Sequence, residues 1–196
     1  MTLAERLRGQ LSETSSHVPL YRGDDVMVTE SALVPAAVLI AVTDRADPGV
    51  LLTLRNSQMR KHPGQVAFPG GRVDPGDDGA IGAALREAEE EIGLQANQVD
   101  VIGLIDSYRT VTGYLITPVI AVVRPDLTLK PQADEVEAIF EPPLARLLDV
   151  SNYVERETEW NGSQRRFREM MWNEYRIWGA TASMLANLAN RIGPWR

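Results

Sequence analysis

The chain has 196 residues, of which 44% are hydrophobic and 24% charged, a length and composition typical of one globular domain with a sizeable core. It contains no cysteine, which excludes disulfide bonds, a thiolate nucleophile and cysteine-ligated metal sites. Its formal net charge of −7 opposes general nucleic-acid binding, although a local basic patch could still hold a small anion.

The sequence contains no recognisable membrane or export segment. The longest apolar run, Ala32 to Val42, includes Pro35 and is too short to span a bilayer as a helix. The N-terminal residues lack the apolar core of a signal peptide. We therefore expect a cytoplasmic protein that does not associate with membranes.

The first half of the chain predicts a helix, several strands and a long loop. Leu3, Leu7 and Leu11 have the spacing of a short amphipathic helix. Residues 56–78 are rich in glycine, proline and charge, so we expect a loop with one short strand in it. The strands expected in this half are 35–42, 50–54 and 65–68.

The second half predicts further helices and paired strands. A helix is expected from about Gly79 to Ile92, ended by Gly93, because glycine most easily adopts the left-handed conformation there. Asn161-Gly162 is a type I′ hairpin signal between two strands. The other expected elements are strands at 99–107, 115–123, 135–140, 153–160 and 163–171 and helices at 143–148 and 180–192. This order predicts an α+β domain with a mixed sheet.

The helix expected at 79–92 carries three glutamates on one flank. Glu87 and Glu91 are one turn apart, Glu90 lies about 60° further round, and Glu89 points elsewhere. The stripe expected to face the core is Ile81, Ala84, Leu85, Ala88 and Ile92. Carboxylates gathered in this way suit a hard divalent cation such as Mg²⁺ or Mn²⁺. A solvated surface is the alternative, and the glycine-rich loop directly before the helix favours a functional site.

The stretch from Gly71 to Leu94 resembles the Nudix box. In that pattern a glycine and an early glutamate precede an Arg-Glu pair, and two consecutive glutamates and a glycine follow. Residues 86–94 fit the second half at every position. Gly71 is one residue further from Arg86 than in the pattern, and Asp78 stands at the position of the early glutamate.

This resemblance implies a fold, an activity and a set of site residues. The implied fold is an α/β/α sandwich with a mixed sheet and a loop–helix–loop motif. The implied activity is the hydrolysis of diphosphates linked to another moiety, with Mg²⁺ or Mn²⁺ as cofactor. The implied metal ligands are Glu87, Glu90, Glu91 and the carbonyl of Gly71, with that of Gly70 as its alternative. The implied catalytic residues are Glu90, Glu87, Arg86 and Glu135. Arg86 would orient the carboxylates, and Glu135 is the candidate for the water-activating base, with a solvated surface residue as its alternative.

Residues 51–71, directly before the box, resemble the extension of Nudix coenzyme A diphosphatases. They share its Leu-Leu-Thr-x-Arg opening and its Gly-Gln-Val-x-Phe-Pro-Gly-Gly end, with Asn56 and Met59 as mild departures. The resemblance implies hydrolysis of coenzyme A or acyl-CoA to 4′-phosphopantetheine, or its acyl form, and adenosine 3′,5′-bisphosphate. The cations expected to bind the substrate phosphates are Arg55, Arg60, Lys61 and His62. A solvated loop, or a structural role for the histidine, is the alternative.

Two other functions stay open. One is a Nudix activity on ADP-ribose, dinucleoside polyphosphates or nucleoside triphosphates. The other is a Nudix-fold binding or regulatory module without turnover, against which the complete Arg-Glu and Glu-Glu pairs argue. We expect residues 1–196 to form a single Nudix hydrolase domain, with the box at about 71–94. Its expected partner is a small-molecule substrate, not nucleic acid or a membrane; a homodimer is common in such folds, and the oligomeric state stays open.

Overall fold

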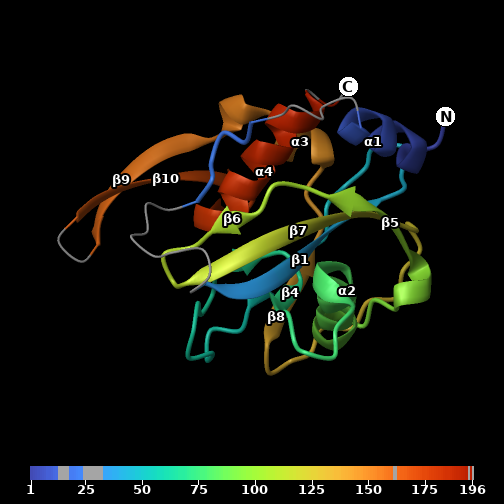
Figure 1. The fold of residues 1–196 in the computed structure, drawn as a ribbon, viewed down its shortest axis with the longest axis horizontal. Helices are drawn as coiled ribbons and strands as arrows, with labels where there is room; N and C mark the ends of the chain where they lie inside the picture. The colour runs from blue at the N-terminus through green and yellow to red at the C-terminus, as the bar shows by residue number, and fades with distance from the viewer. Residues whose placement is uncertain (13–17, 24–32, 161–162, 194, 196) are drawn as a thin grey trace.

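The structure is a computed structural model that describes residues 1–12, 18–23, 33–160, 163–193 and 195. Its helices are α1 (Leu3–Ser12), α2 (Gly79–Ile92), α3 (Leu144–Leu148) and α4 (Gly179–Ile192) (Figure 1). Its strands are β1 (Val34–Thr43), β2 (Leu52–Arg55), β3 (Val66–Ala67), β4 (Gly70–Arg72), β5 (Val99–Leu104), β6 (Tyr108–Arg109), β7 (Tyr114–Val123), β8 (Val136–Phe140), β9 (Val154–Trp160), β10 (Ser163–Trp172) and β11 (Tyr175–Trp178). Short 3-10 turns lie at Ala96–Gln98 and Val150–Asn152.

The central sheet is mixed, as expected, and has the order β4-β1-β7-β5, with β6 also paired to β7. β1 and β7 run parallel along their whole length, from Val34 opposite Tyr114 to Thr43 opposite Val123. The other pairs in this sheet are antiparallel. A parallel pair in the middle of a sheet is covered on both faces, and the almost continuous apolar runs of β1 and β7 meet this requirement.

Helices cover both faces of the central sheet, which confirms the expected α+β sandwich (Figure 1). Alternate residues of β1 supply the two cores, because successive side chains of a strand point to opposite faces. Ala37, Leu39 and Ala41 pack with α2 in one core. Ile40 and Val42 belong to the other core, which includes residues of α1 and α4.

Two smaller sheets complete the described fold. One has the order β3-β2-β8 and the other β11-β10-β9, whose β9–β10 ribbon projects from the body (Figure 1). β9 and β10 pair antiparallel, as the hairpin signal predicts, although the Asn161-Gly162 turn itself lies outside the described residues. β4, β6 and β11 were not expected. The strands predicted at 65–68 and 99–107 are shorter, at Val66–Ala67 and Val99–Leu104.

Helix α2 has the predicted bounds, but its buried stripe differs from the predicted one. Gly93 ends the helix with φ of 70°, the left-handed conformation expected there. Ile81, expected in the core, is 37% exposed, whereas Glu91 is only 4% exposed. The helix packs on β1 and β4 mainly through small residues. The side of the helix that is buried therefore includes Ala83 and Glu91. No helix within the described ranges is long and apolar enough to cross a membrane.

Candidate active site

The candidate site lies where β4 meets the flank of α2. β4 pairs antiparallel with β1, which places Gly70 opposite Val38 and Gly71 opposite Ala37. Gly70 has φ of 159°, and a side chain there would collide with the backbone of Ala37 and Val38. A β-carbon at Gly71 would overlap the carboxylate of Glu87. Glycine at both positions therefore lets the strand and the helix approach closely enough for the loop backbone to reach the glutamates.

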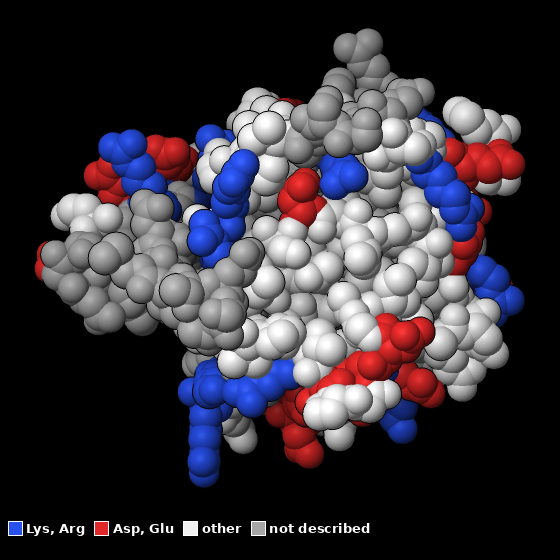
Figure 2. Space-filling model, viewed as in Figure 1, with Lys and Arg blue, Asp and Glu red and all other residues white. Residues whose placement is uncertain are grey.

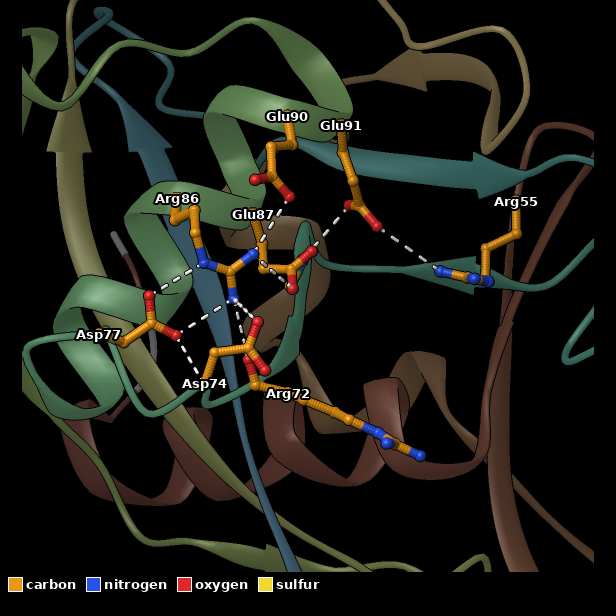
Figure 3. A network of polar contacts seen from close by, with 9 residues as sticks. Arg55, Arg72, Asp74, Asp77, Arg86, Glu87, Glu90 and Glu91 are labelled. Atoms are coloured by element: carbon orange, nitrogen blue, oxygen red, sulfur yellow. Dashed lines mark hydrogen bonds and ion pairs between the residues drawn. The ribbon is translucent and has the colours of Figure 1, made fainter.

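Arg86 is the centre of a polar network that joins this loop to the helix (Figure 3). Its Nε and Nη2 donate to Asp77 at 2.9 and 3.1 Å. Its Nη1 donates to Glu87 at 3.0 Å and to Glu90 at 3.1 Å, and Nη2 also donates to the carbonyl of Arg72 at 3.0 Å. These hydrogen bonds, chiefly those to Asp77, hold the pKa of the Arg86 guanidinium above its ordinary value. The network restricts Glu87 and Glu90 to neighbouring positions, as an orienting arginine requires.

Asp78 stands at the position of the early glutamate in the sequence, but the acidic side chain that contacts Arg86 is that of its neighbour Asp77. The Asp77 carboxylate pairs with Arg86, which lowers the pKa of that carboxyl, and its side chain is 6% exposed. Asp78 precedes the first turn of α2, is exposed and makes no side-chain hydrogen bond to that turn. The sequence showed one additional residue between Gly71 and Arg86. It could not show which of the two neighbouring acids contacts the arginine.

Glu91 is the most deeply buried carboxylate of the site. It accepts a hydrogen bond from the backbone N–H of Gly70 at 3.3 Å, and its Oε1 lies 3.6 Å from Nη1 of Arg55. Burial raises the pKa of the Glu91 carboxyl to about 7, against the opposing effect of Arg55. Burial also raises the pKa of Glu87, although Arg86 acts in the opposite direction. Both carboxylates thus lie where additional positive charge would favour their ionised forms.

The residues present fit a hard divalent cation. Within the described residues, no three acidic or histidine side chains already enclose a point where a metal ion could bind. Glu87 and Glu90 contact Arg86, while Glu91 contacts Arg55 and Gly70. The atoms that could bind a metal ion here are nevertheless all oxygens, which are the ligands that Mg²⁺ and Mn²⁺ prefer. A cation bound among them would compensate the negative charge of Glu87 and Glu91, whose burial raises the pKa of both carboxyls.

Glu135 lies on the same side of the molecule as the helix glutamates. The residue directly precedes β8, and its backbone carbonyl accepts a hydrogen bond from the N–H of Asn56 at 2.8 Å. Its side chain is exposed, and its charge is near enough to contribute to the raised pKa of Glu87 and of Glu91. Glu135 therefore belongs to a separate element of the fold, and its charge reaches the carboxylates of α2.

The four cations expected to bind phosphate occupy different environments. Arg55 turns inward to Glu91, and its Nη2 lies 3.1 Å from the sulfur of Met59. Arg60 and Lys61 are exposed, and so is His62, whose Nδ1 lies 3.0 Å from Gln65 in a tight turn. The structure therefore brings only Arg55 to the glutamates. Figure 2 shows basic side chains directly beside the acidic side chains over α2.

Known proteins resemble this chain in sequence and in fold. The NUDIX domain family matches residues 33–168. The chain is 46% identical to the Nudix hydrolase NudL of Escherichia coli strain K12 over 158 residues, which cover 81% of this chain and 82% of the relative. An Ap4A hydrolase structure from C. elegans covers 59% of this chain and 85% of its own at 19% identity, with a TM-score of 0.50. The Nudix hydrolase RenU from M. smegmatis covers 59% and 74% at 25% identity, also with a TM-score of 0.50.

Proposed function

The chain belongs to the Nudix family of hydrolases that cleave diphosphate-containing substrates, and we propose that its substrate is coenzyme A or an acyl-CoA. The products would be 4′-phosphopantetheine, or its acyl form, and adenosine 3′,5′-bisphosphate. This proposal rests chiefly on residues 51–71, whose sequence resembles the coenzyme A diphosphatase extension.

One structural observation supports a shared site for the extension and the box. The first part of the extension supplies Arg55, which pairs with Glu91 of α2. The last part supplies Gly70, whose N–H donates to the same carboxylate, and Gly71, which lies against Glu87. The extension therefore contacts the expected metal ligands at both of its ends.

The proposed mechanism assigns a role to each group of this site. A divalent cation, Mg²⁺ or Mn²⁺, held by Glu87, Glu90, Glu91 and the carbonyl of Gly71, would neutralise charge on the diphosphate oxygens. Arg86 holds two of these glutamates in place through its hydrogen bonds. Water attacks one phosphorus in line and gives its proton to a carboxylate oxygen of the Glu135 side chain. The new oxygen–phosphorus bond forms as the bond from that phosphorus to the bridging oxygen breaks.

Product analysis tests the substrate. The purified protein is incubated with coenzyme A, dephospho-CoA, ADP-ribose and nucleoside triphosphates, each with Mg²⁺ and with Mn²⁺. We expect adenosine 3′,5′-bisphosphate and 4′-phosphopantetheine from coenzyme A, at the highest kcat/KM of the set. A higher kcat/KM on ADP-ribose or a nucleoside triphosphate would replace the proposal with one of the other Nudix activities. Absence of turnover on every substrate would favour a binding module.

Matched variants test the residues. Glu87→Gln and Glu91→Gln should each reduce kcat by about 10²-fold or more, as the loss of a preorganised charge does. Glu89→Gln is the control, because Glu89 is exposed on another side of α2. Glu135→Gln should reduce kcat by about 10²–10⁴-fold with metal affinity nearly unchanged. A kcat of Glu135→Gln within about threefold of the parent would remove that residue from the mechanism.

A further inference from the structure

Arg72 and Tyr114 form a polar pair at the edge of the candidate site. Arg72 ends β4 and Tyr114 begins β7, and β1 lies between these two strands. The Arg72 guanidinium reaches across to the phenol, with Nη2 at 3.1 Å from the Tyr114 oxygen and Cζ at 5.6 Å from the ring centre. In Figure 3 the Arg72 side chain points away from the carboxylate network. Its own carbonyl nevertheless accepts a hydrogen bond from Arg86.

Arg72 forms no ion pair with a carboxylate among the described residues, and the charge of Asp74 acts on it only as a minor influence. Arg55 and Arg86 both form ion pairs with glutamates of α2. For Arg72, by contrast, the described part of the chain offers no acidic side chain within 4.0 Å, and its hydrogen-bond partner is a neutral phenol. An exposed guanidinium held in this way keeps donors free for an anion from solution.

Lys61 adds a second cation at the same place. The hydrogen bond from Arg72, and to a lesser extent the charge of Lys61, lower the pKa of the Tyr114 phenol. Lys61 belongs to the loop between β2 and β3, so a third segment of the chain acts on the phenol beside Arg72. The phenol oxygen accepts from Arg72 and still has its own hydrogen to donate. Together these groups offer donors of the kind that bind phosphate oxygens.

We propose that Arg72, Tyr114 and Lys61 form a binding site for a phosphate monoester. This site is separate from the glutamates of α2 that are expected to hold the divalent cation. Under the proposed function, on which this assignment rests, the ligand is the 3′-phosphate of coenzyme A. The site replaces Arg55 in that role, because Arg55 is directed toward Glu91. The Arg72 carbonyl accepts a hydrogen bond from Arg86. Arg72 would therefore connect recognition of the 3′-phosphate with the network of Arg86 and the glutamates.

Equilibrium binding tests the site without turnover. Coenzyme A and dephospho-CoA differ by the 3′-phosphate alone, and their dissociation constants are measured by calorimetry in the presence of a chelator. We expect the parent protein to bind coenzyme A about tenfold more tightly than dephospho-CoA, a difference of about 1.4 kcal/mol. Arg72→Gln should abolish this difference and leave dephospho-CoA binding within about twofold of the parent. Tyr114→Phe should reduce the difference, because the ring stays and only the hydrogen bond is lost.

The control variant is Arg124→Gln, which removes an exposed arginine that has no ion pair in the described structure and lies outside this site. It should preserve the preference for coenzyme A. A parent protein that binds both compounds equally would overturn the site, and so would Arg72→Gln with an unchanged preference. A parent that prefers coenzyme A in binding but hydrolyses ADP-ribose faster would overturn the proposed function and leave the phosphate site standing. Melting temperatures show whether each variant is folded.

Discussion

Replacing Gly71 by alanine tests whether the close approach of β4 to α2 positions the carboxylate of Glu87, to which we assign a catalytic role. The backbone at Gly71 does not have a positive φ, so alanine is compatible with the strand. Its β-carbon, however, would fall within 3.0 Å of three atoms of Glu87, including Oε2 at 2.8 Å. Because the carboxylate is the end of a flexible side chain, Glu87 moves and the strand stays. A displacement of about 1 Å at a reacting site costs about 10²-fold in rate, so we expect kcat of Gly71→Ala to fall by that factor.

The assay compares kcat and melting temperature with those of Gly76→Ala. Gly76 lies in the same loop, also without a positive φ, and its added β-carbon would meet nothing within 4 Å. We expect full activity in this control and no loss of melting temperature in either variant. In the double variant Gly71→Ala/Glu87→Asp, kcat should fall by less than the product of the two single reductions. The shorter aspartate side chain leaves more room for the added methyl group. A Gly71→Ala variant with kcat within about threefold of the parent would refute the argument.

Three further predictions follow from the described contacts. Asp77→Asn should lower kcat about tenfold, since it removes a charged partner of Arg86, whereas Asp78→Asn should leave kcat within about twofold of the parent. Equal effects of the two variants in steady-state assays would contradict a role for the Asp77–Arg86 contact. Tyr153→Phe should lower the free energy of unfolding in urea by about 1–2 kcal/mol, because the buried hydroxyl donates to the carbonyl of Leu147 at 2.7 Å. The ion pairs of Glu169 with Arg156 and Arg176 hold its pKa below the ordinary value, so they stabilise the fold above about pH 4.3 and lose this effect as the pH falls. Glu169→Gln should therefore lower the urea midpoint more at about pH 7 than at a pH below about 4.3.

The sequence predicted the parts of the molecule that depend on local patterns. Helix α2 has the predicted bounds, and Gly93 ends it in the predicted conformation, because periodicity and capping are properties of neighbouring residues. The pairing of the strands on either side of Asn161-Gly162 was predicted for the same reason. The Nudix box was also recognisable, since its acidic residues follow one another within a few turns of one helix.

Short strands and the depth of burial depended on partners elsewhere in the chain. Gly70–Arg72 has little intrinsic strand propensity, and it is a strand because β1 supplies hydrogen bonds to it. Ile81, which the pattern placed in the core, is exposed, and Glu91, on the flank, is buried. The packing of α2 on β1 and β4 decided which side of the helix is buried. A helical wheel gives relative angles only, and a rotation of part of a turn changes which residues reach the core.

The contacts of the charged side chains came from the tertiary structure alone. Arg55 pairs with Glu91, and Arg72 reaches Tyr114 across β1, although each pair is more than 30 residues apart in the sequence. The sequence shows positive charge before the box, but it could not show that Arg55 forms an ion pair with a glutamate and that Arg72 donates its hydrogen bond to a phenol. That distinction depends on which strands lie side by side, because a side chain reaches only the residues that the fold brings within a few ångströms of it.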